Sequence, residues 1–106
     1  MTDKEHGEMV VKAVAVQKCT ENIDIHNEWI CHITEKMEKL NVMESCWIEV
    51  LGYVGESGNT TNVDIPLGSD DMEEIIELIK EKLKKEIQVH KNSISEEYEK
   101  LNELLK

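Results

Sequence analysis

The chain confines its turn-forming residues to one short central stretch. Four of its five glycines and its only proline lie between residues 52 and 68. Glycine and proline are the residues that most often interrupt regular structure, so long stretches without them favour continuous helix. Two such stretches, residues 8–51 and 69–106, flank the central interval. The sequence therefore predicts two long helices joined by a small insert.

The apolar residues of the first long stretch recur every seven positions. One row is formed by Met9, Val16, Ile23, Ile30 and Met37, and a second row by Lys12, Cys19, His26, Ile33 and Leu40. This spacing is typical of a helix-pairing seam, and the acidic positions Glu21, Glu28 and Glu35 form an outward face. The second stretch carries its own stripe, in an eleven-residue pattern close to the true helical period. Its members are Met72, Ile76, Ile79, Leu83, Ile87, His90, Ile94, Tyr98, Leu101 and Leu105.

The central insert has the pattern of a β-hairpin. Residues 46–54 are rich in β-branched and aromatic side chains, and residues 62–67 alternate apolar with polar positions. A Gly-, Asn- and Ser-containing loop at 55–61 separates them. The predicted fold is α+β and forms a single domain over residues 1–106. Two long antiparallel helices, about 8–41 and about 70–105, flank a hairpin at about 45–67, and Ser69 or Asp70 caps the second helix.

Two local features leave alternatives open. Residues 9–16 are apolar all round a helix and rich in valine, so they could form a strand, which would give a compact β-α-β-β-α domain. Ser93 and Glu96 fit a capping box, so the last helix could break near residues 92–95. The helical interpretation is favoured at both places.

Charge and cysteine content restrict the class of protein. The chain has 23 acidic and 12 basic residues, for a net charge of -11, which disfavours contact with nucleic acid or anionic membrane surfaces. Its three cysteines have no CxxC spacing and leave one unpaired, which favours a reducing compartment. No apolar run approaches the roughly 18 residues of a membrane span. We expect a soluble cytoplasmic protein that does not bind nucleic acid directly.

The sequence carries no recognisable catalytic, metal-binding or cofactor motif. GxGxxG, GxxxxGK[ST], GxSxG and HExxH are all missing from it. Five residues offer zinc-binding atoms, but their spacing does not bring them together on helices: Cys19, His26, Cys31, His32 and Cys46. We therefore expect no enzyme activity, no catalytic residues, no metal and no cofactor.

Candidate interaction residues lie at three places. Both faces of the hairpin are partly apolar, and Trp47, Leu51 and Tyr53 share the face that we expect to meet a partner. The all-round apolar end from Met9 to Val16 requires burial by another chain. A row of lysines on the second helix is a candidate site for a small anionic ligand, against the simpler interpretation of surface pairs with neighbouring glutamates: Lys80, Lys84 and Lys91.

These observations favour a non-enzymatic, homo-oligomeric binding or regulatory protein. One alternative is a small acidic inhibitor or decoy, encoded by a phage or other mobile element, that binds a basic protein partner. Another is an oligomer that sequesters a small anionic ligand. The order of elements resembles that of prefoldin-type subunits, in which two long helices flank a β-hairpin that assembles with others. No residue motif accompanies this resemblance, so it implies no function or site for the chain.

Overall fold

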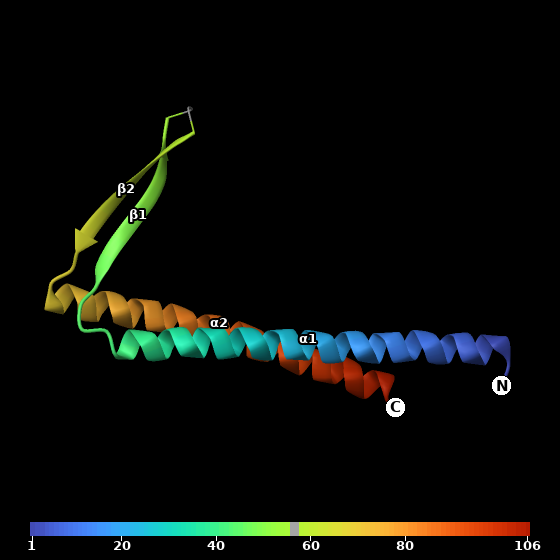
Figure 1. Ribbon diagram of the computed structural model, residues 1–106. Helices are drawn as coiled ribbons and strands as arrows, with labels where there is room; N and C mark the ends of the chain where they lie inside the picture. Colours follow the sequence, from blue (N-terminus) through green and yellow to red (C-terminus); the bar gives the residue numbers. More distant parts are fainter. Residues whose placement is uncertain (56–57) are drawn as a thin grey trace.

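The computed structural model is a pair of long antiparallel helices with a β-hairpin between them in the sequence (Figure 1). It describes residues 1–55 and 58–106, without the side chains of Tyr53 and Val54. The elements, in chain order, are α1 (Asp3–Asn41), β1 (Trp47–Val54), β2 (Asn59–Pro66) and α2 (Ser69–Leu104). The α+β prediction is confirmed. Residues 9–16 are helical, so the compact β-α-β-β-α alternative is wrong.

Helix α1 begins at Asp3, five residues before the expected start. Thr2 is its N-cap, and the Thr2 side chain accepts a hydrogen bond of 3.1 Å from the backbone N–H of Glu5. A cap of this kind contributes about 1 kcal/mol, which offsets the similar cost of about 1 kcal/mol for Gly7 inside the helix. The helix therefore continues through Gly7, whereas the sequence predicted a start at about residue 8.

Helix α2 runs without a break through residues 92–95. Ser93 and Ile94 are both half-buried there, so packing against α1 continues through the segment that resembles a capping box. The predicted cap is wrong: Gly68 is the N-cap, it makes no side-chain hydrogen bond, and Ser69 is the first helical residue. The backbone N–H of Met72 donates to the Gly68 carbonyl at 2.8 Å and begins the helical series.

The two helices form a layer only one helix thick. The molecule measures 70 × 38 × 15 Å and has a radius of gyration of 22.3 Å, whereas a compact globule of about 100 residues has a value near 13 Å. A single layer has no interior between sheets or helix layers, so few side chains are sheltered from water. Among the described residues, the buried ones are Cys19, Ile23, Ile33, Ile76 and Glu97.

The hairpin projects away from the helix pair (Figure 1). Its antiparallel register places Trp47 opposite Pro66, and the Leu67 N–H donates to the Cys46 carbonyl at 3.2 Å beyond the strand ends. Gly55 and Gly58 have φ angles of 67° and 75°, the left-handed conformation that glycine adopts at low cost in turns. Residues 56 and 57 of the expected loop lie outside the described residues.

Candidate functional site

One face of the hairpin is apolar over the half nearest the helices, where its described side chains carry no charge. The register pairs Ile48 with Ile65 and Val50 with Val63, and alternation along the strands places all four side chains on the same face. Val50, Val63 and Ile65 are 51%, 54% and 46% exposed, and Ile48 is half-buried. We call this set the β-branched face. Neither α1 nor α2 covers this face, as these exposed fractions show.

The opposite face carries the interface residues that the sequence predicted. Trp47 and Leu51 are strongly exposed, and the side chain of Tyr53 lies outside the described residues. Glu49 and Asp64 are paired across the strands on this same face. The structure therefore leaves Trp47 and Leu51 accessible, but their face is interrupted by two carboxylates, whereas the β-branched face is not. The β-branched face depends on the strand register, which places Val63 and Ile65 opposite Val50 and Ile48.

The N-terminal end of α1 extends past the C-terminal end of α2 (Figure 1). All of the first fourteen residues are exposed, including Met9, and Val16 is half-buried. The apolar side chains of this end point in several directions around the helix, so α2 could cover only some of them. We call this segment, residues 3–14, the overhang. Its large exposed apolar residues are Met9, Val10, Val11 and Val14.

The three predicted ligand-binding lysines do not share a basic pocket in the structure. Lys80 is half-buried, and its Nζ lies 3.4 Å from Oε1 of Glu77, one turn earlier on α2. The groove of about 280 Å³ beside Lys80 is also lined by Glu44, Glu73 and Glu77. Lys84 and Lys91 are exposed on the helix surface. The acidic lining disfavours an anionic ligand at this groove, and Lys80 pairs with a neighbouring glutamate as the simpler interpretation expects.

Two histidines from distant parts of the chain meet in the helix seam. The Nδ1 atoms of His26 on α1 and His90 on α2 lie 2.8 Å apart in a partly buried contact. The ring of Trp29 is parallel to that of His90, with centroids 6.2 Å apart and planes within 3°. The sequence placed both histidines on apolar stripes. Their direct contact depends on the relative positions of the two helices, which the stripes alone do not specify.

A buried carboxylate was missed by the sequence analysis. Glu97 is 8% exposed and lies in the seam, whereas Tyr98 is 53% exposed. Likewise Leu104 is half-buried and Leu105 is exposed. In the last turns of α2, the face that packs against α1 therefore includes Glu97 and Leu104, and not Tyr98 and Leu105. The spacing of three residues from Ile94 to Glu97 also fits a helical face, but the predicted stripe passed through Tyr98 and did not include this charged residue.

The surroundings of Glu97 favour its ionised form. Hydrogen bonding with the Cys19 thiol is the largest effect and lowers the pKa of Glu97, against an opposing effect of burial, with help from Lys100 and Asn22. Oε1 of Glu97 lies 3.2 Å from Nζ of Lys100. Burial, and then the Glu97 carboxylate, raise the pKa of the Cys19 thiol. These groups line an open groove of about 800 Å³ between the helices.

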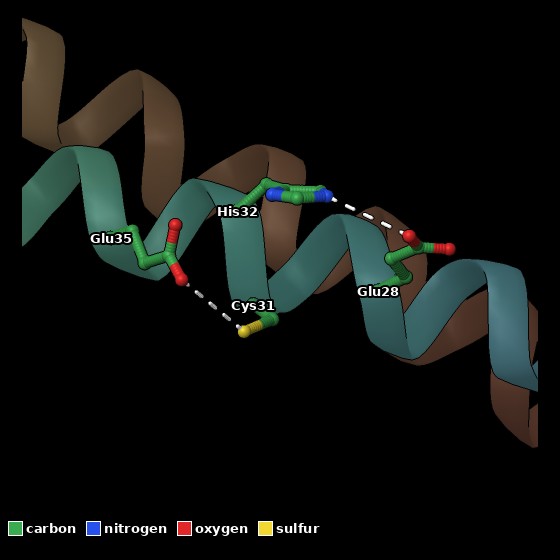
Figure 2. A network of polar contacts seen from close by, with 4 residues as sticks. All are labelled: Glu28, Cys31, His32 and Glu35. Atoms are coloured by element: carbon green, nitrogen blue, oxygen red, sulfur yellow. Dashed lines mark hydrogen bonds and ion pairs between the residues drawn. The ribbon is translucent and has the colours of Figure 1, made fainter.

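Four exposed polar residues of α1 form two local pairs (Figure 2). Nε2 of His32 lies 3.9 Å from Oε1 of Glu28, and Sγ of Cys31 lies 3.9 Å from Oε1 of Glu35. Figure 2 shows the Cys31 and His32 side chains pointing away from one another. Within residues 1–55 and 58–106, no three His, Cys, Asp or Glu side chains gather as a metal-binding group.

Comparison with known proteins supplies no relative from which a site could be transferred. No family model, curated protein or solved structure matches the chain. None of the described helices is long and apolar enough to cross a membrane. The candidate functional features are therefore the surfaces themselves: the β-branched face, the overhang and the polar contacts of the seam.

Proposed function

We propose that this chain is a non-enzymatic, homo-oligomeric binding or regulatory protein that assembles through its helix and hairpin surfaces. The observation that carries the proposal is the uncovered β-branched face. A two-stranded hairpin is marginally stable in water without a partner for its apolar side, and no helix of the same chain provides one. The overhang presents a second uncovered apolar surface on the same molecule.

The size of the hairpin argues that helices also take part in assembly. Strands of eight residues are about 27 Å long, and a two-stranded ribbon is roughly 10 Å wide. One face therefore offers on the order of 270 Å², whereas a stable interface buries about 800 Å² per partner. The hairpin alone is too small. A second copy that also contacts the overhang or an exposed helix face would supply the missing area.

Light scattering on the purified protein tests the proposal. A monomer has a mass of 12.2 kDa, and we expect a multiple of it at micromolar concentration. Because the proposed interfaces are apolar, the assembly should persist when salt is raised, whereas binding of an acidic decoy to a basic protein would weaken steeply. A monomer across the micromolar range would contradict the proposal.

Paired substitutions then test the β-branched face. Val50→Thr with Val63→Thr keeps the branched shape and strand preference but adds two hydroxyls, so it should lower the assembly mass while the helical circular dichroism stays unchanged. The matched control is Glu49→Gln with Asp64→Asn on the opposite face, which should leave the mass unaltered. Equal effects of the two pairs would show that the β-branched face has no special part in assembly.

A further inference from the structure

We propose that His26 and His90 form an acid-sensitive latch that holds α1 against α2. Their Nδ1 atoms lie 2.8 Å apart, a distance typical of a hydrogen bond, although the residues are 64 positions apart in the chain. Both side chains are half-buried in the seam. The latch belongs to the helix pair of one chain, so it stands whether or not copies of the chain assemble.

The geometry limits how many protons the closed pair can hold. Two facing Nδ1 atoms form a hydrogen bond only when one carries a proton and the other offers its lone pair. This condition is met when both rings are neutral, and also when one ring is a cation. When both rings are cations, two N–H donors and two like charges face each other. The doubly protonated pair must therefore separate.

The surroundings of the pair do not remove this conflict. Trp29 stacks on His90, and the groove of about 330 Å³ beside them is lined by Ile33, Val89, Lys36 and Glu86. Of the residues that line this groove, Lys36 on α1 carries a positive charge and Glu86 on α2 a negative one. His32, also on α1, meets the edge of Trp29 with ring centroids 6.4 Å apart. The single negative charge of Glu86 is offset by the positive charge of Lys36, so these two residues together do not neutralise two imidazolium groups.

The direction of the pH effect follows from proton counting. The open helix pair can bind one more proton than the closed pair, so the closed form loses stability as the pH falls. Histidine is the side chain that ordinarily changes charge between about pH 5 and 8. In the pH range in which the open form holds one more proton than the closed form, lowering the pH by one unit shifts the equilibrium toward the open form about tenfold. The seam should therefore loosen under mild acid.

Thermal melting followed by circular dichroism, between about pH 7.5 and about pH 5.5, tests the latch. We expect the melting temperature of the unaltered chain to fall over this interval. It should stay nearly constant in a His26→Leu, His90→Leu double variant, which has an apolar pair in place of the two facing imidazoles. The matched control is His32→Gln, an exposed histidine on the same helix, which should keep the fall. Glu97 does not contribute to the change in melting temperature over this interval, because its pKa is lowered from the ordinary value of 4.5 and it stays ionised.

A second variant and a second readout decide the matter if the double variant does not fold. His90→Gln keeps a side chain that can donate and accept hydrogen bonds but does not titrate in this range. In a Trp47→Phe background, the remaining Trp29 fluorescence should change over the same pH interval and lose that change with His90→Gln. A flat melting profile in the unaltered chain, or an undiminished pH response in the variants that replace His26 or His90, overturns the proposal.

Discussion

Glu97 of α2 and Cys19 of α1 face each other across the helix pair, and only 8% and 6% of their surfaces are exposed. A carboxylate in a largely apolar seam can occupy few positions, because burying it is costly unless hydrogen-bonding groups surround it. The Cys19 thiol, Asn22 and Lys100 provide them here. The contact therefore favours one relative position of α1 and α2 over sliding by a helical turn.

The first prediction concerns the pH dependence that Glu97 confers. Its pKa is lowered in the folded chain, chiefly by hydrogen bonding with Cys19. A lowered pKa contributes stability above the pKa of the unfolded chain, and this contribution is lost as the pH falls through the folded value. Glu97→Gln should therefore melt below the unaltered chain at neutral pH, and the gap should shrink in acid below about pH 4.5. Glu96→Gln, an exposed neighbour, is the control; a gap independent of pH would contradict the prediction.

The second prediction concerns thiol reactivity. The thiolate is the reactive form, and burial followed by Glu97 raises the pKa of Cys19 and suppresses that form. Cys31 is exposed on α1. An alkylating reagent at neutral pH should label Cys31 well before Cys19, as followed by mass spectrometry of the intact chain and its peptides. With Cys31→Ser the early label on the peptide that contains this position should disappear; rapid labelling of Cys19 in the folded chain would contradict its placement in the seam.

The third prediction compares two isoleucines of the same helix. Ile33 is 4% exposed in the seam, whereas Ile25 is 49% exposed. Ile33→Ala removes buried apolar surface and should cost about 2 kcal/mol or more of the free energy of unfolding. Ile25→Ala should change it by less than about 0.5 kcal/mol. Denaturant melts at equal protein concentration measure both, and similar costs would mean that the seam lies elsewhere on α1.

The fourth prediction concerns glycine. Gly7 lies inside α1, and a methyl group added there meets no atom within 4 Å. Gly7→Ala should therefore stabilise the N-terminal end of the helix by about 1 kcal/mol, seen as a higher helical signal and slower amide exchange over residues 3–14. Gly58→Ala is the contrast, because φ at this position is +75° and a side chain is strained there. It should lower the stability of the hairpin; equal behaviour of the two variants would contradict this account.

The order and type of the elements follow from local properties of the sequence. The turn-forming residues lie in one interval, at Gly52, Gly55, Gly58, Pro66 and Gly68. Alternation of apolar and polar residues then indicates the strands, and helical or heptad spacing indicates the two helices. The seam position of Ile23, Ile33 and Ile76 follows from the same periodicity, because side chains that recur with the helical period share one face. Nearest-neighbour preferences and periodicity are enough for these features.

Contacts between distant residues required the tertiary structure. The meeting of His26 with His90 and of Cys19 with Glu97 depends on how far one helix is displaced along the other, and a stripe of apolar residues is compatible with more than one displacement. The uncovered β-branched face depends in turn on the direction in which the hairpin leaves the helices. Periodicity along a chain describes which face a residue occupies, whereas packing in three dimensions decides what that face meets.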